Sequence, residues 1–489
     1  MNSIRIPLTA CALVLAGAVT ASAATIQVTT TKDEFGSGKK CSLREAIKAA
    51  NTDARFGGCP RGKGADRIVL GKGIYRLTRV DSEPDNESGD LNIGGSITIA
   101  GKGPRATVVD GNGGELREGV FEVAAGRAKF TGMTIRRGWD ADDYSGGAIG
   151  HTSPGNLVLD RVRIVGNFAV SGGGVYHSNN ASDVKITRSA FLGNEAENYG
   201  GGFYTAAVGD VTVRNSTFRD NEADYGYGGG LGITGGAGKT VIARSTFAAN
   251  VSEYQYGGGL FIAVSGGARL TKSSVMGNVA GAYGEGSAGG IYANDTDLVV
   301  RDSTVSRNVA DGDGGGIQAN GGSLTVINST ISHNHASYSG GHGGGIYSYG
   351  DTEILSSTVA FNRGYHGAGV YRNSGGLTYK NSIIAGNRRL YNEWTRDCEG
   401  LEPDASLGHN FLGDDTCDSD GPGDIANGTY ETPADPMLDA LDDYGGPTPT
   451  HALLRGSPAI DKGKGCPKRD QRGRKRKGKG KCDIGAFER

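Results

Sequence analysis

Histidine, tyrosine and arginine gather near the end of a long repetitive stretch. Four of the eight histidines fall within 34 residues, with Arg363 and Tyr365 among them: His333, His335, His342 and His366. A tyrosine or histidine base beside an arginine that neutralises a carboxylate suits β-elimination of a uronic-acid polymer. The candidate catalytic residues of such a polysaccharide lyase are Tyr365, His366, His342 and Arg363. A metal site is an alternative, although His333 is expected within a strand that turns it away from His335.

Aromatic rings and carboxylates fill the corresponding segments upstream. Flat rings cover the apolar faces of sugars, and two carboxyl groups at a suitable separation can cleave a glycosidic bond. Glu253 and Glu285 are the candidate pair for hydrolysis. The alternative is a solvated loop face, and acids there would repel a polyanion, so a neutral or cationic glycan fits their charge better. The candidate substrate-binding residues are Trp139, Tyr144, Tyr199, Tyr225, Tyr227, Tyr254, Tyr256, Tyr283, Asp311, Asp313 and Tyr338.

These segments recur with the period of a repeat. Glycine makes up 86 of 489 residues without the three-residue period of collagen, which indicates many tight turns. A motif of the type Gly-Gly-Gly-Val returns together with a regularly spaced asparagine, and such self-similarity indicates a solenoid. The asparagines are 25 to 30 residues apart: Asn167, Asn194, Asn221, Asn250, Asn278, Asn308, Asn334, Asn362 and Asn387.

The register inside each repeat predicts the fold. Apolar or small residues stand 10, 8, 5 and 3 positions before each asparagine, as in Val211, Val213, Ser216 and Phe218 before Asn221. A spacing of two is typical of a strand, and the phase change before the recurrent serine indicates a bend between two short strands. The glycine motif begins a third strand. We predict an all-β, right-handed parallel β-helix of about 27 residues per coil, with stacked asparagine and serine ladders.

The ends of the chain differ from the repeat. Arg5, an apolar stretch and Ala21-Ser22-Ala23 are typical of a secretory signal peptide. Six of the seven cysteines follow it, and export makes disulfides the expectation. Six cysteines allow 15 connectivities, and clustering favours the local pairs Cys41–Cys59, Cys398–Cys417 and Cys466–Cys482. Ser42 and Glu45 form a capping box, which predicts a short amphipathic helix over the first coil.

Several motifs resemble a known family. Cys41-Ser42-Leu43-Arg44-Glu45-Ala46-Ile47 is similar to the motif of the CSLREAI domain, and the Phe191…Asn194 type of repeat resembles polymorphic outer membrane proteins. The stretches from Gly445 to Leu454 and from Cys482 to Glu488 resemble the choice-of-anchor Q C-terminal domain. The resemblance implies a pectate-lyase-like β-helix and an exported bacterial protein, without a catalytic residue set. No sorting signal follows Glu488, which favours free secretion over anchoring to the cell.

Charge is distributed unevenly. Residues 466–489 carry +7, which leaves −9 for the rest of a chain whose net charge is −2. The basic run Lys468–Lys481, between two cysteines, is a candidate contact for anionic envelope polymers or phospholipid surfaces, with a solvated loop as the alternative. Export argues against specific nucleic-acid binding. Calcium is the candidate cofactor. Its candidate ligands form two acidic loops: Asp81, Asp85, Glu87 and Asp90, and Asp414, Asp415, Asp418, Asp420 and Asp424.

The sequence thus predicts a signal peptide over residues 1–23, an N-terminal cap over 24–65, a parallel β-helix over 66–389 and a C-terminal cap with a basic disulfide loop over 390–489. We expect a secreted monomer that binds, and in one hypothesis cleaves, a polysaccharide or cell-envelope glycan along its tyrosine- and acid-lined face. The alternatives are a noncatalytic surface adhesin or envelope protein, and a polysaccharide lyase built on the Tyr/His/Arg cluster. As an enzyme, the protein would be a polysaccharide lyase or a glycoside hydrolase.

Overall fold

The computed structural model describes most of the chain after residue 22. Residues 1–22 therefore lie outside it, and so does nearly all of the predicted signal peptide. Within residues 23–489, the segments not described are 37, 81–85, 116, 142–145, 179–181, 207–208, 283–285, 338–339, 392–393, 401–404 and 478–480. Four residues proposed for the site fall in these segments: Tyr144, Tyr283, Glu285 and Tyr338.

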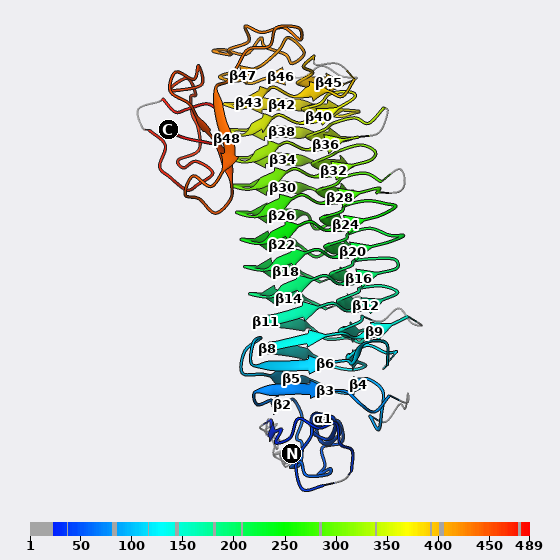
Figure 1. The fold of residues 1–489 in the computed structure, drawn as a ribbon. Coiled ribbons are helices and arrows are strands. Elements are labelled where there is room, and N and C mark those ends of the chain that lie inside the picture. Colours follow the sequence, from blue (N-terminus) through cyan, green and yellow to red (C-terminus); the bar gives the residue numbers. More distant parts are fainter. Residues whose placement is uncertain are drawn as a thin grey trace, which may run out of the picture.

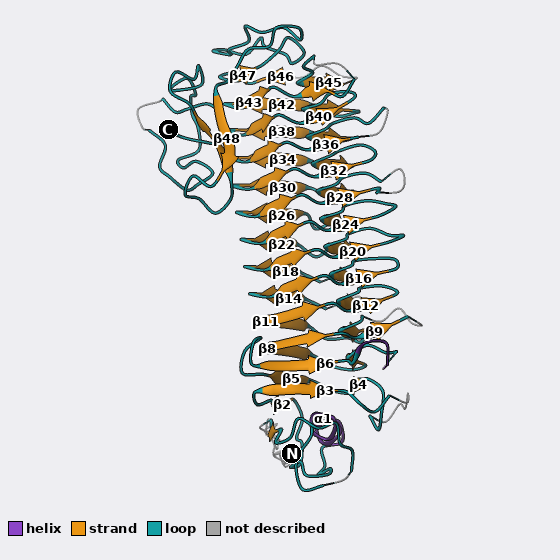
Figure 2. Cartoon of the chain, viewed as in Figure 1, coloured by secondary structure: helices purple, strands orange, loops and turns teal. Residues whose placement is uncertain are grey.

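The molecule is a long stack of coils with irregular structure at both ends (Figure 1). Each full coil adds strands to three parallel sheets, which we number 1 to 3. Figure 2 shows strands joined by loops in every coil and helix only in the N-terminal part, where α1 (Leu43–Thr52) and the 3-10 turn η1 (Gly113–Glu115) lie. Among the described residues, no helix is long and apolar enough to cross a membrane.

Sheet 1 receives two strands from most coils. Its strands are β1 (Thr25–Gln27), β2 (Asp66–Val69), β3 (Gly73–Arg76), β5 (Ile97–Ala100), β6 (Thr107–Asp110), β8 (Ala128–Arg136), β11 (Leu157–Val165), β14 (Val184–Thr187), β15 (Ala190–Leu192), β18 (Val211–Arg214), β19 (Thr217–Arg219), β22 (Thr240–Ala243), β23 (Thr246–Ala248), β26 (Ala268–Thr271), β27 (Ser274–Met276), β30 (Leu298–Arg301), β31 (Thr304–Ser306), β34 (Leu324–Ile327), β35 (Thr330–Ser332), β38 (Thr352–Leu355), β39 (Thr358–Ala360), β42 (Leu377–Lys380), β43 (Ile383–Ala385), β46 (Ala405–Ser406) and β47 (Phe411–Leu412).

Sheets 2 and 3 each receive one strand per coil. Sheet 2 contains β4 (Leu91–Ile93), β7 (Phe121–Val123), β10 (Ile149–His151), β13 (Val175–His177), β17 (Phe203–Thr205), β21 (Leu231–Thr234), β25 (Leu260–Ala263), β29 (Ile291–Asn294), β33 (Ile317–Asn320), β37 (Ile346–Ser348), β41 (Val370–Arg372) and β45 (Cys398–Gly400). Sheet 3 contains β9 (Trp139–Asp140), β12 (Phe168–Ala169), β16 (Glu195–Ala196), β20 (Glu222–Ala223), β24 (Val251–Ser252), β28 (Val279–Ala280), β32 (Val309–Ala310), β36 (His335–Ala336), β40 (Arg363–Gly364) and β44 (Arg388–Arg389).

The two polar ladders predicted from the sequence are present. Asn194 Nδ2 donates to Asn221 Oδ1 at 2.8 Å, and the backbone N–H of Ser189 donates to Ser216 Oγ at 3.2 Å. These side chains are buried, so the ladders satisfy backbone groups that the bends leave unpaired. The same register stacks Phe191 on Phe218 with ring centroids 4.4 Å apart in the core.

The corners between strands use left-handed backbone. His333 has a φ of 59° and follows β35, so it lies at a corner before Asn334. The expectation that His333 is within a strand was therefore wrong. The reason is that each asparagine of the ladder is preceded by a corner residue, which at most coils is Gly, Asp, Ala or Arg and also adopts this conformation.

The N-terminal cap closes the first coil. Helix α1 packs against β1, β2 and β4, and its predicted capping box is formed by Ser42 and Glu45. The buried guanidinium of Arg44 pairs with Asp33 at 2.7 Å and also binds the Ser88 and Gly89 carbonyl oxygens. The Cys41–Cys59 disulfide joins the start of this helix to the loop that follows it.

The parallel ladder continues one coil beyond Arg389, through β45, β46 and β47. Segment 413–434 follows over the last coil (Figure 1). Residues 435–489, which we name the clasp, then return along the outside of sheet 1 and contain the antiparallel pair β48 (Leu438–Asp442) and β49 (Thr450–Leu453). The disulfides Cys398–Cys417 and Cys466–Cys482 complete the three local pairs that clustering favours. Three disulfides are typical of an exported protein.

The clasp is bound to the solenoid by polar and apolar contacts. Gln471 Nε2 donates to Thr304 Oγ1 at 2.9 Å, and Gln471 Oε1 accepts from Thr330 Oγ1 at 2.7 Å. A second hydrophobic core joins Ile383 and Phe411 of the coils to residues of the clasp such as Ile484. Outward-facing residues of sheet 1 are thereby buried in these coils.

Candidate functional site

The variable loops join sheet 3 to sheet 2, and they divide the predicted strip into two faces. Alternation along β20 and the loop after it turns Glu222 and Asp224 outward on either side of the buried Ala223. Further along the same loop, Tyr227 stacks on Phe261 of sheet 2, with centroids 4.0 Å apart. In this coil the acids therefore lie on the sheet 3 side and the last loop tyrosine lies on the sheet 2 side. The acidic and aromatic residues of this part of the predicted strip thus occupy two faces.

Carboxylates gather on the sheet 3 side. Oxygens of Glu222, Asp224 and Glu253 lie within 4.8 Å of one another. Burial, followed by the charges of Glu195 and Glu222, raises the pKa of Asp224 to about 6. Burial and a hydrogen bond to Glu253 also raise the pKa of Glu222. The predicted partner of Glu253, Glu285, lies outside the described residues, so the acids that accompany Glu253 here are Glu222 and Asp224.

Loop tyrosines stack from coil to coil. Tyr225 and Tyr254 form an exposed pair at the loop tips, with centroids 5.3 Å apart. The rings of Tyr199 and Tyr227 are tilted against each other with centroids 4.6 Å apart, and Tyr256 stacks on Tyr292 at 4.8 Å. Trp139 likewise stacks on Phe168, at 4.3 Å. The rings therefore contact one another along the stack, while Tyr225, Tyr254 and Trp139 remain exposed to solvent.

Two of the predicted catalytic residues meet at the C-terminal end of the stack. The imidazoles of His342 and His366 stack with centroids 5.0 Å apart. His342 Nδ1 lies 2.9 Å from Asp313 Oδ1, and His366 Nδ1 lies 3.3 Å from Glu399 Oε1. A carboxylate that accepts from Nδ1–H leaves Nε2 as the nitrogen able to accept a proton. We name Asp313, His342, His366 and Glu399 the histidine site.

Tyrosines and arginines surround the histidine site. Tyr371 packs on His342 with centroids 4.3 Å apart, and burial raises the pKa of the Tyr371 hydroxyl. Burial acts to raise the pKa of Glu399, but the Gly367 N–H and Arg396 hold it below its ordinary value. Arg396 Nε lies 3.1 Å from Glu399 Oε2, and Arg389 Nη2 lies 3.7 Å from the same oxygen. Glu399 is therefore fixed as a carboxylate beside His366.

The other two predicted catalytic residues have different neighbours. Arg363 pairs in register with His335 and Arg388 on sheet 3, and it is exposed there. Tyr365 packs on Tyr391, with centroids 5.5 Å apart. Arg363 and Tyr365 are close to His366 in sequence, but their side chains lie on other faces of the loop and contact other residues. The arginines that pair with Glu399 beside His366 are Arg389 and Arg396, which sequence reasoning did not nominate.

A pocket of about 280 Å³ adjoins the histidine site. It is lined by Arg389, Trp394, Thr395, Arg396 and Tyr430. The rings of Trp394 and Tyr430 meet edge to face at 5.3 Å, and 45% of Trp394 is exposed. One feature of the sequence could have located Glu399. If the repeat of sheet 2 strands is continued by one coil, Glu399 falls beside Tyr371, as it does in the structure.

Neither predicted calcium loop brings three ligands together among the described residues, where the group of Glu222, Asp224 and Glu253 is found instead. Asp81 and Asp85 are outside those residues. Burial, then Glu118, raises the pKa of Asp90 to about 8. In the second loop, Asp414 accepts from the Asp397 N–H at 3.1 Å and Asp424 from the Asn410 N–H at 2.8 Å. These carboxylates accept hydrogen bonds from backbone N–H groups of the last coil.

A family model agrees with this architecture. The family model described as "Right handed beta helix region" matches residues 173–337, less than half of the chain. No curated protein sequence matches. Among solved structures, the crystal structure of pectate lyase Pel9A is similar at 13% sequence identity and a TM-score of 0.40, with 95% of this chain and 96% of that chain covered. The chain folds as a right-handed parallel β-helix.

Proposed function

We propose that this protein binds an acidic polysaccharide at the C-terminal end of its solenoid. The observation that carries the proposal is the pocket between Trp394 and Tyr430, whose other walls include Arg389 and Arg396. A pocket of about 280 Å³ is of the size that holds one sugar ring and its substituents. Neighbouring sugars of the chain would extend over the adjoining coils.

The chemistry of the walls favours a sugar that carries a carboxylate. The exposed indole of Trp394 offers an apolar face to the C–H side of a sugar ring. Guanidinium groups match carboxylates because their N–H donors form a planar fork. The guanidinium groups of Arg389 and Arg396 both pair with one carboxylate, that of Glu399. One positive charge is therefore left over, which a carboxylate of the ligand would neutralise.

The distribution of charge along sheet 3 supports an acidic rather than a neutral glycan at this end. The outward row runs from Trp139 and Phe168 through Glu195 and Glu222, and it ends with Arg363 and Arg388. Repulsion of a polyanion, which the sequence suggested for the segments upstream of the histidines, applies to the coils around β16–β24. The coils next to the pocket attract a polyanion.

Cleavage by β-elimination is a second candidate function, favoured by the histidine site. Nε2 of His366 or His342 could take the proton next to the sugar carboxylate, whose charge an arginine neutralises. The glycosidic C–O bond then breaks as a carbon–carbon double bond forms, and the leaving oxygen takes a proton from the second imidazole. The noncatalytic alternative, an adhesin or envelope protein, would use the same pocket without breaking the polymer.

Binding is tested by calorimetric titration of the mature protein with polygalacturonate, alginate, a neutral glucan and chitosan. We expect the uronates to bind and Trp394→Ala to weaken binding about tenfold. Tyr225→Ala is the control, because it removes another exposed ring from the distant loop tips, 61% exposed against 45% for Trp394. Binding that survives Trp394→Ala but is lost in Tyr225→Ala would place the polymer on the loop tips and overturn the proposal.

Cleavage is tested in the same mixtures by chromatography and by absorbance of unsaturated ends. A lyase shortens a uronate with a rise in absorbance that His366→Gln removes and Glu253→Gln leaves intact. Shortening without absorbance that depends on Glu253 would indicate a hydrolase at the carboxylate group instead. Binding without shortening would identify the noncatalytic alternative.

A further inference from the structure

The basic run in the clasp has a structural and an exposed part. Arg472 is buried and pairs with Asp470 at 2.7 Å, and Arg476 is buried and pairs with Glu488 at 3.2 Å. Arg476 also donates to the carbonyl oxygens of Asp483 and Gly485, at 3.0 and 2.7 Å. These two guanidinium groups hold the clasp together. A fully solvated loop therefore does not describe the run.

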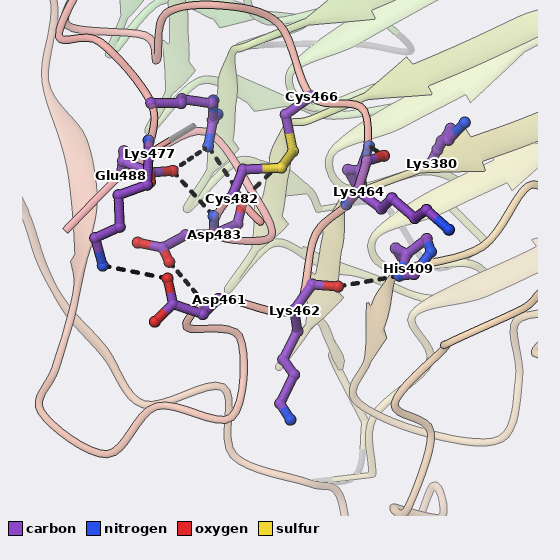
Figure 3. Close-up of a disulfide and its surroundings, with 12 residues drawn as sticks. Lys380, His409, Asp461, Lys462, Lys464, Cys466, Lys477, Cys482, Asp483 and Glu488 are labelled. Atoms are coloured by element: carbon purple, nitrogen blue, oxygen red, sulfur yellow. Dashed lines mark hydrogen bonds and ion pairs between the residues drawn. A yellow bond between two sulfur atoms is a disulfide. The ribbon is translucent and has the colours of Figure 1, made fainter. Parts of the chain in front are cut away.

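The lysines of the run line a pocket. This pocket, of about 380 Å³, lies beside the Cys466–Cys482 disulfide. Its lining residues are Gly465, Cys466, Pro467, Lys468, Lys475, Arg476, Lys477, Lys481 and Cys482. The disulfide fixes both ends of the run, so the ammonium groups converge without a large loss of chain entropy on binding. Figure 3 shows the disulfide with Lys477 on one side and Lys464 and Lys380 on the other.

Most of this positive charge is not neutralised by the protein. Lys477 Nζ lies 3.2 Å from Asp461 Oδ1, the contact drawn in Figure 3, and Arg476 is paired with Glu488. Lys468, Lys475 and Lys481 are exposed, and none has a carboxylate within 4 Å among the described residues. Three charges on one pocket wall, carried by a chain that is acidic elsewhere, indicate a binding surface for an anion.

We propose that this pocket binds phosphate groups of an anionic polymer or lipid. Ammonium groups are compact point charges that suit phosphate, whereas recognition of carboxylate favours the planar fork of a guanidinium. The one guanidinium in the pocket wall, that of Arg476, already donates to Asn328 Oδ1, Glu488 and two backbone carbonyls. The available donors are therefore the lysines. This site lies in the clasp, on sheet 1, and is separate from the pocket proposed for the polysaccharide.

The test uses the full mature chain and three probes: inorganic polyphosphate, vesicles of phosphatidylglycerol and phosphatidylcholine in equal parts, and polygalacturonate. The variant Lys468→Gln/Lys475→Gln/Lys481→Gln should bind phosphate probes about a hundredfold more weakly at low salt, at roughly fivefold per lysine. The matched control is Lys129→Gln/Lys185→Gln/Lys239→Gln, which removes the same charge from exposed positions on the solenoid. We expect the control to bind within threefold of the parent.

The two phosphate probes distinguish the source of the ligand. Binding of polyphosphate in solution supports a phosphate polymer, and binding of vesicles but not polyphosphate supports a lipid surface; both require the three lysines. The proposal is overturned if neither phosphate probe binds, if the control loses as much affinity as the triple variant, or if the lysines are needed equally for polygalacturonate. Loss of polygalacturonate binding in Trp394→Ala alone concerns the other pocket and leaves this one unaffected.

Discussion

Replacing one asparagine of the buried ladder should destabilise the coils on either side of it. Asn278 Oδ1 accepts from the Asn250 backbone N–H at 3.0 Å and from Asn250 Nδ2 at 2.9 Å. Asn278 Nδ2 donates to the Phe247 carbonyl at 3.1 Å and to Asn308 Oδ1 at 2.8 Å. In Asn278→Ala the Asn250 N–H loses the side-chain acceptor that it has here. The Asn308 amide oxygen is less affected, because the Asn278 backbone N–H still donates to it.

The magnitude follows from these contacts. One buried N–H without a partner costs about 1–3 kcal/mol, and two weakened side-chain and carbonyl contacts add roughly 0.5–1.5 kcal/mol each. We therefore expect the free energy of unfolding to fall by about 2–6 kcal/mol. In a solenoid each coil contacts mainly its neighbours, so the loss should be concentrated in the coils that contain Asn250, Asn278 and Asn308.

Hydrogen exchange followed by mass spectrometry measures this loss coil by coil. Amides of β23, β27 and β31 should exchange faster in Asn278→Ala, while those of β2 and β5 should be unchanged. Asn198→Ala is the control, because this loop asparagine is outside the ladder and only half-buried. A loss below about 1 kcal/mol, or one spread evenly over the molecule, would refute the reasoning from the ladder.

Three further predictions concern charge and the clasp. The pKa of Asp224 is raised to about 6, so the folded protein loses stability as pH rises from about 4 to 6. Asp224→Asn should therefore raise the free energy of unfolding by about 1 kcal/mol at pH 7.5 after solvent screening, seen as a higher melting temperature, and change it little at pH 4. Burial lowers the pKa of His177 to about 3, so the folded protein loses stability as pH falls below about 6.5. In His177→Leu the free energy of unfolding, measured by urea titration, should therefore fall less between pH 6 and 4 than in the parent protein. Gln471→Ala removes donors to Thr304 and an acceptor for Thr330, and should speed limited proteolysis of the clasp while that of the coils stays unchanged.

The fold was predictable because its determinants are local and repeated. The spacing of Asn221 and Asn250, the serine before each bend and the capping box at Ser42 each indicate one turn, strand or cap without knowledge of the rest. Repetition then fixes the third dimension, since residues one period apart must stack. The cysteine pairs followed for a similar reason: short separations left the local bridges as the favoured ones.

The site was only partly predictable. His342 and His366 are one period apart at equivalent positions, so their stacking is implied by the repeat. Arg363 and Tyr365 were grouped with them because they are close in sequence, and the loop sends them to other neighbours. Glu399 and Arg396 come from the chain after Asn387, where the asparagine motif no longer marks the register, and Arg389 lies two residues after that last asparagine.

By itself, then, the sequence determined the parallel β-helix, its ladders and its capped ends, since these depend on contacts at a constant separation along the chain. Only the tertiary structure decided which face each loop residue occupies, which carboxylate holds each histidine, and which basic residues are buried in the clasp. Those outcomes depend on the backbone conformation of each loop, which sets the face that a side chain occupies. They also depend on the path by which residues 435–489 return along sheet 1. No periodic pattern in the sequence encodes either of them.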